Sequence, residues 1–248
     1  MESILEAARA GREHEAIEAA AGREGVPVET IRAGVADGSI IVIAGRGRAA
    51  GAVAIGRGLR TKVNASIGTS SDIIDLEMEL EKARVAEAAG ADTLMELSTA
   101  GDLDGIRRQV LDTSSLPVGN VPLYQAFNQA IDRHKTPVAL TEELLFEVVE
   151  RQAADGIGFM AVHSGVNLQT LSVLKGQGGR SGGLVSRGGA FMVAWMTHNE
   201  QENPLYADFD RLMEILRRHD VVLSLGNGMR AGAIADATDQ AQIQELLV

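Results

Sequence analysis

Two short segments combine an arginine with glycines in a way that suits a bound phosphate group. They are Ser186-Arg187-Gly188-Gly189 and Asn227-Gly228-Met229-Arg230. Arginine makes charge-assisted hydrogen bonds to phosphate oxygens. Glycines let backbone N–H groups approach an anion at the start of a helix. The segments are therefore candidate phosphate contacts, and the alternative is that both arginines pair with structural carboxylates such as Glu96.

Polar side chains also follow the other predicted strands. Asn64 and Ser66 share one face of the strand predicted over 62–67, because side chains alternate along a strand. In barrels and open parallel sheets the chemistry lies at the carboxyl ends of the strands. We therefore expect one pocket to gather the strand-end residues, which are Asn64, Ser66, Met95, Glu96, Ser98, Asn120, Tyr124, His163 and Ser164.

His163 has the widest chemical range of these residues. It could donate a hydrogen bond, act as a base or bind a metal ion. No second histidine stands at ligand spacing, so we expect no metal site in this chain. Tyr124 could donate its hydroxyl to a ligand or pack in the core, and Met95 could cover a ligand ring or belong to the core. No lysine ends a strand and no close carboxylate pair occurs, which argues against a Schiff-base aldolase and a glycosidase.

The elements that must position these residues alternate between strand and helix from residue 61 onward. Such alternation predicts an α/β fold with a parallel sheet and right-handed crossovers. Repeats of roughly 30 residues are typical of a TIM barrel. The expected strands are 62–67, 93–97, 117–122, 159–163, 184–186 and 221–225, and the expected helices are 72–89, 104–112, 124–132, 141–154, 168–175, 205–218 and one from about 236 to 248.

Six strands are fewer than the eight of a closed barrel. We therefore expect an incomplete (βα)8 barrel over residues 61–248, with two βα units missing from this sequence. Residues 1–60 form a separate N-terminal extension in this interpretation. It contains helices over 3–21 and 28–35 and a small hairpin between 40–43 and 52–55.

Composition excludes several classes of protein. The 248 residues carry a formal net charge of -11, which argues against nucleic acid or an anionic membrane as the main partner. The absence of cysteine excludes disulfides, thiolate zinc sites and cysteine-ligated iron–sulfur clusters from these residues. No apolar run reaches the roughly 18 residues of a membrane span, and no signal-peptide pattern begins the sequence. We expect a cytoplasmic protein.

Several long motifs resemble one known family in their sequence and order. They are 63–72, 91–99, 117–126, 185–189 and 223–230. Together they are similar to phosphomethylpyrimidine synthase (ThiC) and to its anaerobic paralogue, 5-hydroxybenzimidazole synthase. The resemblance extends over essentially the whole sequence. It implies a (βα)8 barrel and a non-canonical radical S-adenosylmethionine lyase that rearranges 5-aminoimidazole ribotide.

The resemblance also implies which residues contact that ribotide. The matching positions are Met95, Tyr124, His163, Ser186, Arg187, Gly188, Gly228, Met229 and Arg230. Two further contact positions depart from the family pattern, because Ser66 replaces the usual asparagine and Asn227 the usual aspartate. Ser164 and Ala231 replace the usual alanine and proline. Either of the first two changes could retune the site toward another product or mark a site that has lost its activity.

The cofactors implied by the family are a 4Fe–4S cluster, S-adenosylmethionine and zinc, and the implied assembly is a homodimer. The family's zinc histidines and its three-cysteine cluster motif would follow Val248, so we expect these residues alone not to cleave S-adenosylmethionine. The favoured product is the thiamine pyrimidine phosphate, and the alternative product is 5-hydroxybenzimidazole for cobamide biosynthesis. Two further hypotheses are a cluster-free ribotide-binding protein and an ordinary phosphosugar barrel enzyme that uses His163 as acid and base.

Overall fold

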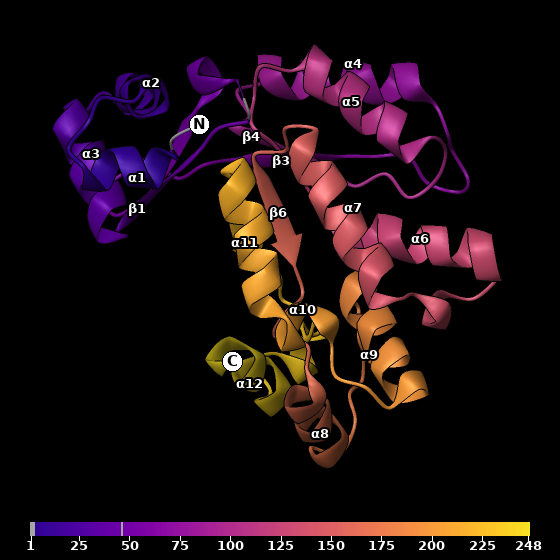
Figure 1. The fold of residues 1–248 in the computed structure, drawn as a ribbon. Coiled ribbons are helices and arrows are strands. Elements are labelled where there is room, and N and C mark those ends of the chain that lie inside the picture. Colours follow the sequence, from indigo (N-terminus) through magenta and orange to yellow (C-terminus); the bar gives the residue numbers. More distant parts are fainter. Residues whose placement is uncertain (1–2, 46) are drawn as a thin grey trace. The chain divides into compact units, whose positions relative to one another are not determined.

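The computed structural model describes residues 3–45 and 47–248, and Figure 1 shows their path. The chain divides into two compact units. Unit 1 comprises Met1–Val121, Glu150–Met160 and Ile215–Val222. Unit 2 comprises Pro122–Val149, Ala161–Glu214 and Leu223–Val248.

The N-terminal part of unit 1 is helical and ends in a hairpin. Its elements are α1 (Ile4–Arg9), α2 (Glu15–Glu24), α3 (Val28–Asp37), β1 (Ile40–Ile43), the 3-10 turn η1 (Ala49–Gly51) and β2 (Val53–Gly56). The antiparallel pairing of β1 with β2 confirms the predicted hairpin. The single helix predicted over 3–21 is wrong, because Gly11 adopts a φ of 68° and His14 caps a second helix. Ile17, Ile31 and Val42 pack in a core that this part of the chain makes by itself.

A parallel sheet follows, and its strands are neighbours in the order of the sequence. They are β3 (Asn64–Ile67), β4 (Thr93–Glu96), β5 (Val118–Asn120), β6 (Phe159–Val162) and β7 (Val222–Leu225). The helices α4 (Leu76–Ala88) and α5 (Leu103–Thr113) alternate with the first three strands. This arrangement confirms the α/β prediction with a parallel sheet, and the closed eight-stranded barrel stays a prediction.

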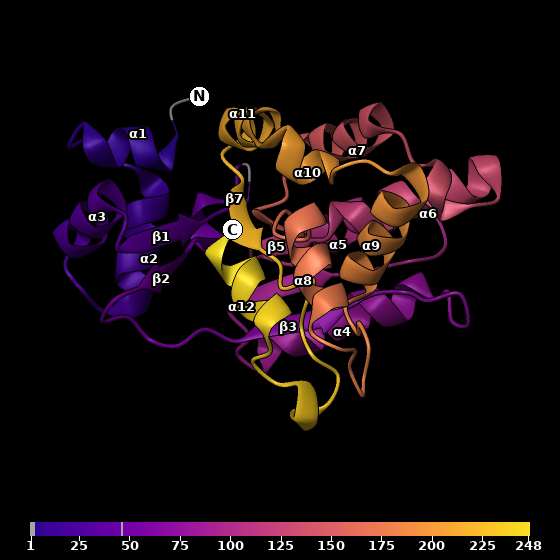
Figure 2. The same ribbon diagram turned by 90° about the horizontal axis from the view of Figure 1, so that it is seen from below.

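Unit 2 contains most of the remaining helices. They are α6 (Pro122–His134), α7 (Glu142–Ala154), α8 (Leu168–Gly176), α9 (Arg187–Asn199), α10 (Pro204–Ala207), α11 (Phe209–His219) and α12 (Gln240–Leu247), with 3-10 turns η2 (Pro137–Ala139) and η3 (Ile234–Asp236). Both α7 and α11 end in segments of unit 1. Figure 2 shows α12 beside α8, and the two helices are in contact. The helix predicted over 205–218 is two helices, because Asp208 ends α10 outside helical geometry.

The strand predicted over 184–186 is wrong. The backbone N–H of Gly226 donates to the carbonyl of Val162 at 2.8 Å, so the strand ends of β6 and β7 bond each other directly and leave no place between them. Ser186 instead caps the N-terminus of α9, where its hydroxyl accepts a hydrogen bond from the Gly189 N–H. The described sheet therefore has five strands where the sequence predicted six.

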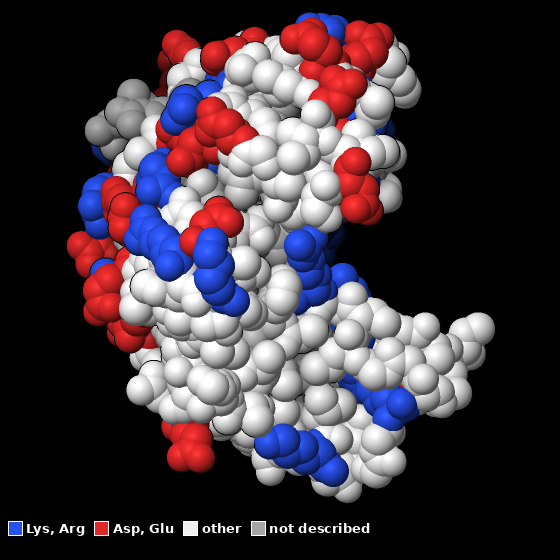
Figure 3. Space-filling view, turned by 90° about the vertical axis from the view of Figure 1, so that its right-hand side faces the viewer, with Lys and Arg blue, Asp and Glu red and all other residues white. Residues whose placement is uncertain are grey.

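Charged side chains are unevenly distributed on the face of the protein that Figure 3 shows. Acidic side chains gather toward the top and the left of this view, often beside lysines and arginines, whereas the lower part carries mainly lysines and arginines among uncharged side chains. Among the described residues, no helix is long and apolar enough to cross a membrane. The expectation from the net charge that neither nucleic acid nor an anionic membrane is the main partner stays a prediction.

Candidate functional site

His163 follows β6 in unit 2, and its ring is almost completely buried. Its Nε2 lies 3.3 Å from the Ser186 hydroxyl oxygen. Its Nδ1 is buried and has no hydrogen-bond partner among the described residues. Burial lowers the pKa of His163 to about 4, and the positive charge of Arg230 acts in the same direction. His163 is therefore a neutral imidazole near pH 7, with one nitrogen left for a ligand.

Glycines bring three backbone segments of unit 2 against this histidine. A Cβ at Gly188 would lie 2.5 Å from Cε1 of His163, and one at Gly189 would lie 2.3 Å from the Gly228 carbonyl oxygen. Gly226 also approaches the ring, since its Cβ would lie 3.3 Å from Cδ2. The glycines thus allow the end of β6, the start of α9 and the turn after β7 to meet.

Arg187 stands at the first position of α9, and its side chain is exposed. Its guanidinium carbon lies 5.5 Å from the ring centre of Tyr124 and 5.8 Å from that of Phe191. Neither Arg187 nor Arg230 forms an ion pair with a carboxylate of the described residues. Both can therefore bind an anion, although the charge of Arg230 also acts on the Glu245 carboxylate. The alternative that both pair with structural carboxylates is not observed. Tyr124 supports Arg187 through its ring face.

In the turn Asn227–Arg230 after β7, the side chains and the backbone amides differ in whether they are available to a ligand. Asn227 is exposed, whereas the Met229 side chain is completely buried. The N–H groups of Gly228 and Met229 donate to the Glu245 carboxylate at 2.7 and 2.8 Å. The turn therefore offers a ligand the side chains of Asn227 and Arg230, while both of these backbone amides are already bonded.

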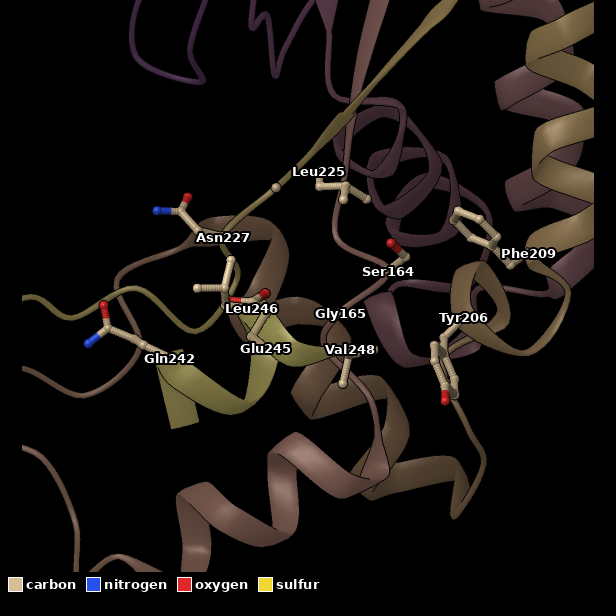
Figure 4. Close-up of a pocket in the computed structure, with 11 residues that line it drawn as sticks. Ser164, Gly165, Tyr206, Phe209, Leu225, Asn227, Gln242, Glu245, Leu246 and Val248 are labelled. Atoms are coloured by element: carbon tan, nitrogen blue, oxygen red, sulfur yellow. The ribbon is translucent and has the colours of Figure 1, made fainter. Parts of the chain in front are cut away.

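A cavity of about 420 Å³ opens beside the same turn within unit 2. Figure 4 shows Asn227 and Leu225 on one side of it, Tyr206 and Phe209 on another, and Glu245 and Leu246 of α12 below. Its lining is mostly apolar, with Ser164 and Gln242 as further polar groups. Such a cavity has the size of a small-molecule site.

The predicted residues of unit 1 lie on two different faces of the sheet. Ser66 pairs with Met95, and Met95 pairs with Gly119, so their side chains share one face. Glu96 and Asn120 pair with each other and point to the opposite face. Glu96 is buried there, which raises its carboxyl pKa, and the Asn120 amide donates to Gln152 at 2.7 Å. The expectation that Glu96 and Asn120 join a pocket with Ser66 is wrong.

Lys62 precedes β3 and takes no part in that strand. Its ammonium lies 2.8 Å from the Glu24 carboxylate, and both side chains are largely buried. The pair ties the start of β3 to α2 within unit 1. Lys62 is therefore a structural residue rather than a reactive amine.

The described residues do not fit a metal ion or an iron–sulfur cluster. No group of three or more histidine, aspartate or glutamate side chains among residues 3–45 and 47–248 could hold a metal ion. The sequence contains no cysteine thiolate to hold a cluster.

Comparison with known proteins identifies the family. The sequence profile of the radical SAM ThiC family matches residues 3–248. The chain belongs to the radical SAM ThiC family. A 5-hydroxybenzimidazole synthase of Geobacter metallireducens is 56% identical over 248 residues, and a phosphomethylpyrimidine synthase of Methanoculleus marisnigri is 55% identical over 246 residues. Phosphomethylpyrimidine synthase 1 of Methanosarcina barkeri is 57% identical over 246 residues.

The ThiC-family relatives are longer than this chain. The matches cover 99–100% of the chain but only 57–58% of the lengths of these three relatives. The chain thus spans a little over half the length of the curated relatives it matches. The family resemblance read from the motifs is confirmed.

Sequence reasoning missed three residues that support this candidate site. Asn203 is completely buried, and its amide donates to the carbonyls of His163 and Val166 at 2.9 and 2.8 Å. Glu245 and Arg180 hold the turn after β7. Each is far in sequence from the segment it contacts, so no local motif could reveal it.

Proposed function

We propose that this chain forms the ribotide-binding part of an enzyme that rearranges 5-aminoimidazole ribotide to 4-amino-5-hydroxymethyl-2-methylpyrimidine phosphate. Membership of the radical SAM ThiC family and relatives named phosphomethylpyrimidine synthase support this proposal. The observation that carries it is the buried Nδ1 of His163, which has no partner among the described residues and lies in a cluster with Ser186 and Gly188. In this proposal the five parallel strands belong to a (βα)8 barrel.

The proposed contacts in unit 2 are of two kinds. Charged side chains bind the phosphate, and uncharged side chains bind the rest of the ribotide. The two arginines Arg187 and Arg230 bind the phosphate, because their charges are not paired with carboxylates of the described chain. His163 Nδ1 and the Asn227 amide form hydrogen bonds with the uncharged groups of the ligand. The neutral state of His163 fits this role, because burial disfavours a charged ring and the positive charge of Arg230 acts in the same direction.

The remaining predicted contacts keep narrower roles in this proposal. Ser186 orients His163, while Gly188 and Gly228 allow the backbone segments to approach. Met229 shapes the turn rather than offering a free polar group, because its side chain is buried and its N–H and carbonyl groups are bonded to Glu245 and Arg180. Contacts of Ser66 and Met95 with the ribotide stay predictions, as do the homodimer and the cytoplasmic location.

Radical chemistry in this proposal depends on groups that these residues do not hold. The 4Fe–4S cluster would supply the electron that cleaves S-adenosylmethionine, and zinc is the second metal that the family resemblance implies. Neither fits the side chains of the described residues. We therefore assign to this chain the binding and orientation of the ribotide, and no step of the radical reaction.

A second product has support of its own. The relative from Geobacter metallireducens is named 5-hydroxybenzimidazole synthase and is as similar as the phosphomethylpyrimidine synthases. Ser66 and Asn227 depart from the usual residues of the family. A different product would therefore depend on these two positions.

The function is tested by product analysis. The protein expressed from its complete reading frame, with its cluster reconstituted anaerobically, is incubated with 5-aminoimidazole ribotide, S-adenosylmethionine and a reductant. We expect a phosphorylated pyrimidine in mass spectra, and hydroxybenzimidazole would select the second product. No turnover with an intact cluster would overturn both enzymatic functions. Binding of the ribotide by a protein that takes up no cluster and gives no product would instead select a cluster-free binding protein.

A further inference from the structure

Glu245 of α12 makes a bidentate contact with the backbone of the turn after β7. Its Oε1 accepts the N–H of Gly228 at 2.7 Å and its Oε2 accepts the N–H of Met229 at 2.8 Å. Two hydrogen bonds from consecutive amides to one carboxylate fix the orientation of both peptide planes. Asn227 and Arg230 flank these two amides, so their side-chain directions depend on the same contact.

Arg180 binds the same turn through a backbone carbonyl group. Its guanidinium donates to the carbonyl oxygen of Met229 at 2.7 Å. The same guanidinium forms two hydrogen bonds of 2.6 and 2.8 Å with the carboxylate of Asp239, the residue that caps α12. The hydrogen bond from Arg180 is the main cause that keeps the pKa of Asp239 well below its usual range. Arg180 therefore links the turn to the N-terminus of α12, while Glu245 links it to the C-terminal half.

We infer that Glu245 and Arg180 are positioning residues for ribotide binding. They hold the N–H and carbonyl groups of the turn so that Asn227 and Arg230 point toward the ligand, and neither residue touches the ligand itself. This inference rests on the proposed function. It also implies that the ribotide phosphate is bound by arginine side chains and not by the amides of Gly228 and Met229, because Glu245 already accepts from both.

The geometry at position 245 requires two acceptor oxygens, one for each backbone N–H. Burial raises the pKa of Glu245, while the two backbone hydrogen bonds and the charges of Arg180 and Arg230 act in the opposite direction. Glutamine has nearly the same shape but offers one acceptor oxygen, and its NH2 group would face a backbone N–H. Glu245→Gln therefore breaks one of the two hydrogen bonds without leaving a cavity.

Calorimetric titration of 5-aminoimidazole ribotide into the protein from its complete reading frame tests the inference. We expect Glu245→Gln to raise the dissociation constant about tenfold. The matched control is Glu87→Gln in unit 1, where the carboxylate also accepts a backbone N–H, from Ser115 at 3.2 Å. We expect the control to lower thermal stability and to leave the dissociation constant unchanged.

The outcomes separate this inference from the function on which it rests. No binding to the unaltered protein overturns the proposed function and the inference together. Binding to the unaltered protein with equal affinity in Glu245→Gln overturns the inference alone and makes Glu245 a purely structural residue. Tighter binding by the variant also overturns it, because Glu245 would then compete with the phosphate. If Glu245→Gln does not fold, Arg180→Lys tests the same turn from its carbonyl side, and an unchanged dissociation constant rejects the inference.

Discussion

At the residue scale, the site depends on a histidine that is kept neutral and on glycines that let it be buried. The Nδ1 atom of His163 is an unsatisfied polar group in the described structure, and such groups are rare in protein interiors. A ligand that bonds this nitrogen would remove the penalty. The histidine is thus both a source of instability in the free protein and a source of affinity for the ligand.

The pH dependence of stability should show the burial of His163. Its pKa of about 4 in the folded state lies below the ordinary value of 6.5, so the unfolded state binds the proton more readily. The favourable contribution of the neutral, buried ring to the stability of the fold is therefore present in full above about pH 6.5, and it is lost as the pH falls toward 4. In urea unfolding, His163→Gln should lose less stability over that interval, by at most about 3 kcal/mol. An equal loss in both proteins would contradict the burial of the ring, and His198→Gln at an exposed histidine serves as the control.

A methyl group at Gly188 should disturb the same ring. Its Cβ would lie 2.5 Å from Cε1 of His163, so the ring must move. We expect Gly188→Ala to lower the free energy of unfolding by about 1–3 kcal/mol and to weaken ribotide binding. Gly176→Ala in α8 is the matched control, because the added Cβ would have no heavy atom within 4 Å beyond its chain neighbours and the nearby backbone of its own helix. A Gly188→Ala protein that is as stable as the control would show that the ring has room to move.

At the element scale, sequence patterns predicted most helices and strands but not where they are interrupted. The prediction for α3 and the hairpin is confirmed, since Gly38 ends the helix and apolar runs flank the turn. The predicted strand at 184–186 and the unbroken helix over 3–21 are wrong. Three residues carry too little pattern to define a strand, and only the direct bond between β6 and β7 shows that no strand lies there. The roles of Glu245 and Arg180 depend on tertiary contacts that no local pattern contains.

The N-terminal helices should depend on their shared core. Ile17 of α2 is 1% exposed and Leu5 of α1 is 41% exposed. Ile17→Ala should lower the free energy of unfolding by about 2–5 kcal/mol, because it leaves a cavity in that core. Leu5→Ala should change it by no more than about 0.5 kcal/mol. Equal effects of the two changes on denaturant unfolding would contradict the described packing of α2.

At the scale of the whole molecule, the family was predictable from motif order, whereas the number of strands was not. Long motifs such as Leu223–Arg230 carry family information because many positions match together. The matches with relatives confirm that interpretation over the entire chain. A closed barrel depends on pairing between distant strands, and the described sheet has five strands in open order.

Cofactor content gives a prediction at this scale. We expect the 248-residue chain, after anaerobic reconstitution with iron and sulfide, to hold no stoichiometric 4Fe–4S cluster, because it contains no cysteine. Iron and acid-labile sulfide analysis after gel filtration measures this. Four irons per chain with the matching absorption spectrum would show that other side chains ligate the cluster.

The central claim is that the cluster around His163 and Arg187 binds a phosphorylated ribotide. The most direct measurement is calorimetric titration of 5-aminoimidazole ribotide into the unaltered protein, Arg187→Gln and Arg211→Gln. Arg211 is a matched control, because its guanidinium lies 4.2 Å from the ring centre of Phe146 and it has no role in the proposed site. We predict saturable binding that Arg187→Gln weakens by about tenfold or more and Arg211→Gln leaves unchanged. Absence of binding, or equal affinity in all three proteins, would contradict the claim.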